Sequence, residues 1–185
     1  MAARLRVGWF SFTCSEDSTI VFIELMNSMY FRWKKCIDFR HFNTLRKKGD
    51  MKNLDVAFVE GAISGKEEEK RLREIRRNCR KLVAVGNCAC VGVPSNQRNS
   101  FDSSRMEEIR PVLRKFGLRE KVSAVSDIVK VDDKVPGCPM DEKIFLEKLE
   151  GLLGEFGISS CSKEGTDSPA AKNPAGSPKR SNITR

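Results

Sequence analysis

Short apolar runs recur along the chain and predict its strands. Residues 5–12, 54–61, 81–86 and 125–131 are short runs rich in apolar residues, and polar, glycine or charged residues end or follow each run. Runs of this length bounded by turn-forming residues are typical of strands that are buried in a sheet. A less regular run at residues 36–42 predicts one more strand.

The segments between these runs carry apolar residues at helical spacing. Repeats of three and four residues place the large apolar side chains on one face of each segment. The helices predicted in this way span residues 18–33, 66–79, 104–117 and 140–157, and Pro111 is expected to break or kink the third. Residues 87–99 and 135–139 lack the repeat and predict an irregular loop and a turn.

Strands and helices alternate along the chain, which predicts an α/β fold with a parallel sheet and helices on both faces. We expect the folded domain to comprise residues 1–158. From residue 159 the composition shifts to Ser, Pro, Gly, Ala, Lys and Asn, with almost nothing apolar. Because such a segment cannot bury enough apolar surface to fold, residues 159–185 are predicted to form a disordered basic tail.

Charge and cysteine content narrow the class of protein. The 185 residues carry a formal net charge of +9, which a basic surface and a basic tail explain. We expect no nucleic-acid partner, because the chain has no aromatic-rich basic motif of the RNA-binding kind. The sequence has no signal peptide and no apolar run that could span a bilayer, so we expect a cytoplasmic protein. In the reducing cytosol, cysteines serve metal or redox chemistry more often than disulfides.

Three of the seven cysteines follow predicted strands. Cys14, Cys88 and Cys138 each lie shortly after a strand end, and glycines flank the second and third. Ligands of open α/β sheets bind at the carboxyl ends of the strands, so we expect the three thiols at one edge of the sheet. Thiolates, usually four, hold iron–sulfur clusters. Each thiol alone would be explained as a small buried side chain, but their convergence favours a cluster.

A cluster of this kind needs a fourth ligand, and two residues compete for that position. Asp17 lies three residues after Cys14, where both side chains would share one turn near a helix start. A carboxylate oxygen is harder than a thiolate but binds iron. Cys90, two residues beyond Cys88, is the rival, and an iron without a fourth protein ligand is the third alternative.

Other polar residues give weaker indications. Glu60 ends the strand at residues 54–61, and it either lies near the cluster or a subunit interface or caps the turn after the strand. Glu16 is expected to be solvated or to cap a helix. His41 is the only histidine, which excludes a histidine-rich metal site.

Four stretches together resemble one protein family. They are RVGWFSFTC, LDVAFVEGAIS, VAVGNCACVGVP and VSDIVKVDDKVPGCPMDE. In this order they resemble the opening strand with its first ligand, the Glu-Gly strand end, the G-x-C-A loop and the V-x-G-C-P turn of the small subunits of nickel–iron hydrogenases. The likeness covers about residues 5–153 and is nearest to the cytoplasmic delta and gamma subunits of sulfhydrogenases and coenzyme F420-linked enzymes. The iron–sulfur subunit of respiratory complex I is a more distant match.

The resemblance implies a flavodoxin-like domain that binds one [4Fe–4S] cluster through Cys14, Asp17, Cys88 and Cys138. A large partner subunit would hold the nickel–iron site, where hydrogen is split or made. This chain would relay electrons from or to that site, without catalysing the reaction itself, and exchange them with a further electron-transfer subunit or a soluble carrier. Two alternatives stay open, namely a redox module of the complex I type and a degenerate subunit without a cluster.

The chain departs from the family pattern in three places. Asp17 stands where the family has a cysteine, which would give the cluster a potential different from that of the all-thiolate form. Residues 91–93 follow the G-x-C-A loop as Val-Gly-Val, where two glycines are usual. After Cys138 only Cys161 remains, so we expect no second cluster.

Overall fold

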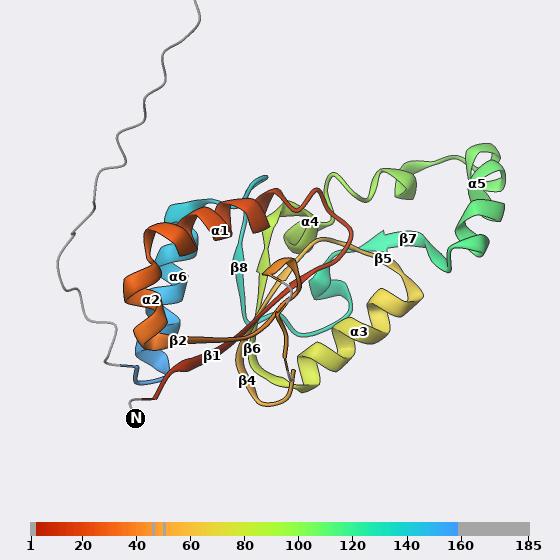
Figure 1. Ribbon diagram of the computed structural model, residues 1–185. Helices are drawn as coiled ribbons and strands as arrows, with labels where there is room; N and C mark the ends of the chain where they lie inside the picture. Colours follow the sequence, from red (N-terminus) through yellow and green to blue (C-terminus); the bar gives the residue numbers. More distant parts are fainter. Residues whose placement is uncertain (1–2, 46, 50, 159–185) are drawn as a thin grey trace, which may run out of the picture.

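A six-stranded sheet forms the centre of the computed structural model, which describes residues 3–45, 47–49 and 51–158 (Figure 1). The strand order is β3-β2-β1-β4-β6-β8, and every neighbouring pair is parallel except β2 with β3. The strands are β1 (Leu5–Ser11), β2 (Ile37–Phe42), β3 (Lys47–Lys48), β4 (Leu54–Glu60), β6 (Cys79–Val85) and β8 (Asp133–Val135). The five parallel strands follow the flavodoxin-like order 2-1-3-4-5, so the predicted fold class is confirmed. The tail predicted at residues 159–185 lies outside the described residues.

Helices cover both faces of this sheet. On one face lie α1 (Asp17–Ser28), α2 (Tyr30–Cys36) and α6 (Glu142–Glu155), and on the other lie α3 (Lys66–Arg77) and α4 (Gly86–Val91). β5 (Ile63–Gly65) and β7 (Leu118–Ser123) pair antiparallel in a second sheet, and α5 (Ser103–Lys115) beside β7 projects from the domain (Figure 1). Short 3-10 turns occupy Asn43–Leu45, Gln97–Ser100 and Val125–Asp127. In the part of the chain that the structure describes, every helix is too short or too polar to cross a bilayer.

Alternate side chains of the central strands enter two separate cores, one on each face. In β4, Val56 and Phe58 pack with residues of α1, α2 and α6, whereas Ala57 and Val59 pack with residues of α3 and α4. Every residue of β4 is buried, which explains why this strand appears in the sequence as a continuous apolar run. In the first core, the Trp9 ring stacks on Phe22 with centroids 4.2 Å apart and fastens α1 to β1.

The strand predicted at residues 125–131 is wrong. Val125–Asp127 form a 3-10 turn, and the fifth parallel strand is β8, which begins only at Asp133. The apolar residues of the predicted strand pack against the second core from a loop, so their hydrophobicity reflects burial rather than pairing. Asp132 fixes this loop to β6, because its N–H donates to the Leu82 carbonyl oxygen at 2.9 Å and its carboxylate accepts from the Leu82 N–H at 2.8 Å.

Other differences concern boundaries within elements. The helix predicted over residues 18–33 is interrupted at Met29, which separates α1 from α2. The loop predicted at residues 87–99 begins as the short helix α4. α5 runs past Pro111 without ending, so Pro111 does not break the helix as one of the two predicted alternatives required, and the kink stays a prediction. β5 and β7 escaped prediction because both are short and lack a regular alternation of apolar residues.

Candidate metal centre

The loops that follow β1, β6 and β8 meet at the carboxyl edge of the sheet. Cys14 lies in the first loop, Cys88 in the first turn of α4 directly after β6, and Cys138 in the turn after β8. β1 lies between β2 and β4, so the direction of the strand order reverses beside it. Ligands of open α/β folds bind in the crevice at such a reversal. The three thiols therefore lie where the fold itself provides a binding site.

Two of the three thiols belong to one small apolar cluster. Cys88 is buried with Ala62 and Val122, and the partly buried Cys14 packs against this cluster. Burial of Cys14, reinforced by the negative charge of Glu60, raises the pKa of its thiol to about 12. A thiol with this pKa keeps its proton at neutral pH until a bound cation displaces it.

Asp17 lies beside the third thiol. It is the first residue of α1, and its Oδ2 accepts a hydrogen bond from Cys138 Sγ at 3.5 Å, although 121 positions separate the two in the sequence. This hydrogen bond and the carboxylate charge raise the pKa of the exposed Cys138 thiol. Asp17 thus already contacts another candidate ligand.

Cys90 is directed away from these residues. Its side chain is buried in the second core, and its Sγ donates to the carbonyl oxygens of Ala84 at 3.5 Å and Val135 at 3.7 Å. The loops that carry Asp17 and the three thiols therefore lie at one edge of the sheet, whereas the Cys90 side chain packs from α4 onto β6 and β8. Cys79 begins β6 at the opposite edge of the sheet, and Cys161 lies outside the described residues.

Hydrogen bonds from residues that no motif identifies hold these loops together. Ser95 Oγ donates to Cys88 Sγ over 3.3 Å, and it also lies 3.2 Å from the carbonyl oxygen of Thr13. The Asn87 N–H donates to the Gly137 carbonyl oxygen at 2.7 Å, and the Gly137 N–H donates to Asn87 Oδ1 at 2.9 Å. The loop after β6 is consequently joined to the loops after β1 and β8.

Two glycines permit the close approach of these loops. Gly86 has φ +77, and a Cβ added there would lie 3.0 Å from Ser18 Oγ. Gly137 has φ +119, and a Cβ added there would lie 2.4 Å from the Pro139 carbonyl oxygen. Residues that carry a side chain rarely adopt such a φ, so both positions favour glycine. The two glycines therefore let the turn after β6 and the turn after β8 pack closely on α1 and on themselves.

Glu60 supports the start of α1 from the end of β4. Its carboxylate is buried and accepts from the Ser18 N–H at 3.0 Å and from the Thr19 hydroxyl at 2.5 Å. Burial raises the pKa of this carboxyl group. Glu60 thus caps a helix rather than the turn that follows its strand, and its charge also acts on the Cys14 thiol.

The chemistry of the candidate ligands is compatible with an iron–sulfur cluster. Among the described residues, no group of three or more His, Cys, Asp or Glu side chains lies close enough to hold one metal ion. A cubane distributes its ligands over separate irons, and soft thiolates are its usual ligands. Three thiols and one carboxylate from loops at a single edge fit that requirement.

A comparison with protein families gives one match over most of the chain. The family described as the NADH ubiquinone oxidoreductase 20 kDa subunit matches residues 14–152. This match begins at Cys14 and includes the loops of Cys88 and Cys138.

Individual relatives are subunits of hydrogenases. The chain is 28% identical over 116 residues to the NAD-reducing hydrogenase HoxS subunit delta of Cupriavidus necator, with 53% of this chain and 54% of the relative covered. It is 27% identical over 149 residues to the sulfhydrogenase 2 subunit delta of Pyrococcus furiosus, with 76% and 59% covered. The chain thus spans less than two thirds of the length of these relatives.

Among solved structures, one chain of the NAD+-reducing [NiFe]-hydrogenase in the H2-reduced state superposes with a TM-score of 0.68. The two chains are 26% identical, and the superposition covers 82% of this chain and 92% of the other.

Proposed function

The chain belongs to the family of the NADH ubiquinone oxidoreductase 20 kDa subunit. Because its relatives include hydrogenase subunits, we propose that it is the electron-transfer small subunit of a [NiFe] hydrogenase. Cys14, Asp17, Cys88 and Cys138 would hold one [4Fe–4S] cluster. A large subunit would carry the nickel–iron site, and a further subunit or soluble carrier would exchange electrons with this chain. Since thiolate ligands must stay reduced, we assign the complex to the cytoplasm.

The observation that carries this proposal is the meeting of four candidate ligands from distant parts of the sequence. Cys14 packs against the small cluster that contains Cys88, and Asp17 accepts a hydrogen bond from Cys138. Loops joined by hydrogen bonds hold the two pairs at the reversal of the strand order. The hydrogenase subunits among the relatives support the same function.

Each candidate ligand, and Ser95 beside it, would have its own role at this edge. Cys14, Cys88 and Cys138 would each lose a proton on binding iron, and Asp17 would bind through its carboxylate. When bound, the cluster would take up and release one electron at a time. Ser95 donates to the sulfur of Cys88, and hydrogen bonds to ligating sulfurs influence reduction potential.

Apolar side chains around this edge support a protein partner. Ile20, Val91 and Val93 are 58%, 59% and 49% exposed, and they lie on α1 and at the end of α4. Apolar residues clustered beside polar groups mark protein interfaces more often than open surface. We therefore assign this surface to the large subunit, which would also exclude water from the cluster.

Low-temperature EPR with iron and sulfide analysis, on the complex purified without oxygen, tests the proposal. The wild-type complex should contain about four irons per chain in a reducible cluster. Asp17→Cys should retain this iron and change the EPR spectrum or the midpoint potential, because a thiolate replaces a carboxylate ligand. Cys79→Ser is the matched control, since this thiol lies at the opposite edge, and it should change neither.

The possible results separate the parts of the proposal. A wild-type complex without iron would contradict the cluster. Full iron with identical spectra for wild type and Asp17→Cys would remove Asp17 from the ligand set and leave the three thiols. The copurified large chain should contain two C-x-x-C pairs for nickel, and a large chain without them would assign this subunit to a complex I-type module instead.

A further inference from the structure

We propose that a pocket at the opposite edge of the sheet binds a phosphate-bearing anion. The pocket has a volume of about 240 Å³, and its lining includes Arg6, Arg77 and Arg80 together with Asn53, Asn78 and Cys79. Nothing in the proposed electron transfer uses these residues, so the inference goes beyond that function.

Three different elements bring the arginines together. Arg6 lies near the start of β1, Arg77 ends α3, and Arg80 lies near the start of β6. The Leu54 N–H donates to the Asn78 carbonyl oxygen at 2.9 Å and closes the pocket between β4 and the end of α3. The convergence is therefore set by the amino ends of the parallel strands and by the end of α3.

The carboxylate of Asp55 beside this pocket is already bound by Arg6. The Asp55 carboxylate accepts from the N–H, Nε and Nη2 of Arg6 at 2.9, 3.0 and 2.8 Å. Asp55 is largely buried, and Arg80 approaches it only to 3.7 Å. Arg77 makes no ion pair with any carboxylate within the described residues. Asp55 and, more weakly, Asp38 act on Arg6, while Arg77 and Arg80 line the same pocket, which leaves an excess of positive charge.

The neighbouring groups do not remove this excess. Burial raises the pKa of the Cys79 thiol, which therefore stays neutral. Arg76 next to the pocket is held by the Cys79 carbonyl oxygen at 3.0 Å and by Asp132 at 3.4 Å. The nearby carboxylate of Asp132 is thus paired with Arg76, which does not line the pocket.

Guanidinium groups in this arrangement suit phosphate. Arginine presents a planar set of N–H donors that binds phosphate oxygens in pairs, with charge assistance. The Arg80 guanidinium lies over the Phe156 ring at 4.5 Å, which restricts its side chain before a ligand arrives. A bound phosphate would also reduce the repulsion between Arg77 and Arg80.

Isothermal titration calorimetry with inorganic phosphate, on the full chain in the complex in which it is purified, tests the pocket. Ionic strength is kept constant with chloride. The wild-type complex should bind phosphate saturably, and the double variant Arg77→Gln/Arg80→Gln should bind it at least about tenfold more weakly, because charge-assisted hydrogen bonds are lost. Arg6 is left intact, because its removal would leave Asp55 buried without a partner.

The matched control removes the same charge elsewhere. Arg105→Gln/Arg114→Gln on the projecting α5 should keep the wild-type affinity. Equal weakening in both double variants would show only general electrostatic attraction and would overturn the proposal, as would the absence of saturable binding to the wild-type complex. Thermal unfolding in chloride shows whether each variant is folded, and Arg77→Gln alone provides the comparison if the double variant is not.

The source of the phosphate is decided with two further probes. Adenosine monophosphate represents soluble phosphate esters, and vesicles of phosphatidylcholine with phosphatidylserine represent a lipid surface, with pure phosphatidylcholine as their control. Binding of either probe that the Arg77→Gln/Arg80→Gln variant loses supports the site and identifies its class of ligand. The iron content of these variants should equal that of the wild-type complex. If phosphate does not bind, the proposed electron transfer is therefore not affected.

Discussion

Ser95 has a single hydroxyl hydrogen and two acceptors within reach, the sulfur of Cys88 at 3.3 Å and the carbonyl oxygen of Thr13 at 3.2 Å. A thiolate bound to iron is the stronger acceptor, because hydrogen bonds to charged groups are about twice as strong as neutral ones. In the loaded protein the hydroxyl should therefore donate to Cys88. A donor at a ligating sulfur stabilises the reduced, more negative state of a cluster.

On the proposed function, Ser95→Ala should make the reduction potential more negative. Loss of one such bond shifts the reduction equilibrium by about tenfold, which is about 59 mV for a one-electron couple. Potentiometric titration followed by EPR measures the shift. Ser95→Thr should restore most of the wild-type value, and Ser100→Ala, in the same region but bonded only to the Gln97 carbonyl oxygen, should have no effect. An unchanged potential in Ser95→Ala at full iron content would contradict the role of the hydroxyl.

At the scale of elements, the turn from β6 into α4 depends on Gly86. Its φ is +77, and a Cβ at this position would lie 3.0 Å from Ser18 Oγ, so alanine would be both strained and crowded. Gly86→Ala should lower the free energy of unfolding by about 1–3 kcal/mol. Gly117→Ala separates the two causes, because Gly117 also has a positive φ, of +63, but has open space around it.

Urea unfolding of the three proteins measures this difference. Gly117→Ala should cost about 1 kcal/mol from backbone conformation alone. If both substitutions cost the same, the contact with Ser18 contributes nothing, and α1 is not pressed against this turn in the way the structure indicates.

The elements that sequence pattern predicts well are those buried on both sides. β1, β4 and the second half of β6 are mostly apolar because helices cover both faces, and so composition alone identifies them. The same signal misplaces the last strand, because residues 125–131 are apolar as a packed loop while β8 itself carries Asp133 and Lys134. In β1, β4 and β6 the buried apolar residues are also the residues that pair in the sheet, whereas residues 125–131 are buried without pairing.

The candidate ligands divide in a similar way. Cys14, Cys88 and Cys138 could be chosen from sequence, because each follows a strand and parallel strands end at one edge. Their contacts could not, because Ser95 and Asn87 act through bonds to loops far away in the sequence. Sequence spacing also left Cys90 as a rival, and only the direction of its side chain into the second core separates it from the other thiols.

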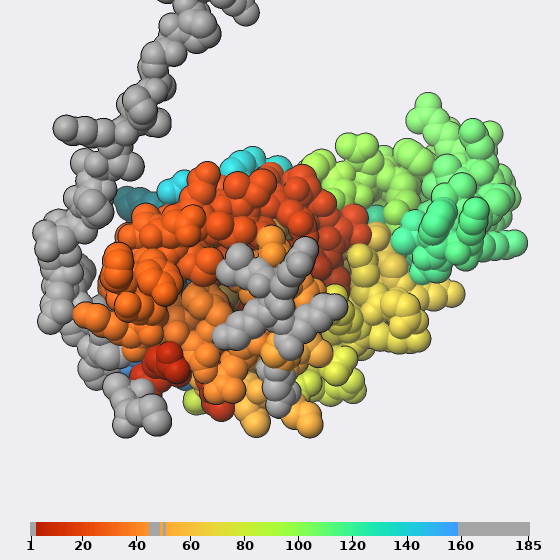
Figure 2. All heavy atoms as spheres, in the orientation of Figure 1, coloured from red at the N-terminus to blue at the C-terminus, as the bar shows by residue number. Residues whose placement is uncertain are grey.

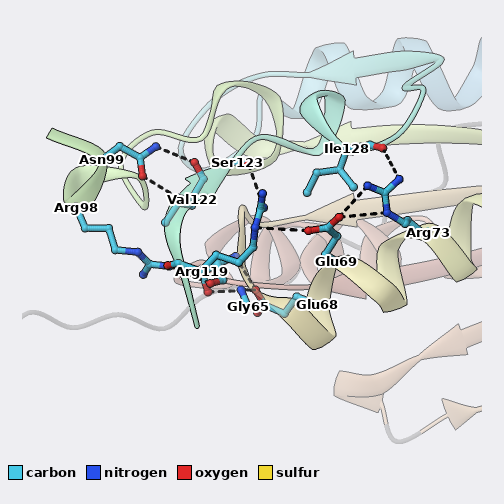
Figure 3. A network of polar contacts seen from close by, with 11 residues as sticks. Gly65, Glu68, Glu69, Arg73, Arg98, Asn99, Arg119, Val122, Ser123 and Ile128 are labelled. Carbon is cyan, nitrogen blue, oxygen red and sulfur yellow. Dashed lines mark hydrogen bonds and ion pairs between the residues drawn. The ribbon is translucent and has the colours of Figure 1, made fainter. Parts of the chain in front are cut away.

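At the scale of the whole molecule, the proposed interface and the proposed pocket lie at opposite edges of one sheet. Figure 2 shows that α5 and its neighbours form a lobe set apart from the main body. In Figure 3, Arg98, Arg119 and Glu69 lie among the polar contacts at its base, where Arg98 donates to the Ser64 carbonyl oxygen at 2.9 Å. This network joins the base of the lobe to β5 and α3, and Asn99 also binds Val122, which packs with Cys88. Val112 on α5 takes no part in it, so a change there should leave the carboxyl edge intact.

That separation provides the control for the partner surface. Val91 is 59% exposed at the end of α4, close to the thiols, and Val112 is 51% exposed on α5. A glutamate at either position meets water in the isolated chain, so neither change should alter its stability by more than about 0.5 kcal/mol. Within the complex, a charge at Val91 would have to be buried against apolar surface of the large subunit, which is costly without a partner.

Val91→Glu should therefore reduce copurification of the chain with its large subunit by at least about tenfold, whereas Val112→Glu should leave it unchanged. Affinity purification of the tagged large subunit, with quantification of the small subunit by mass spectrometry, measures both. Recovery of both variants at the wild-type level would show that the carboxyl edge is not covered by a partner. The loss of both would instead assign α5 to the interface, and the large subunit would then have to extend from the thiols to the tip of the lobe.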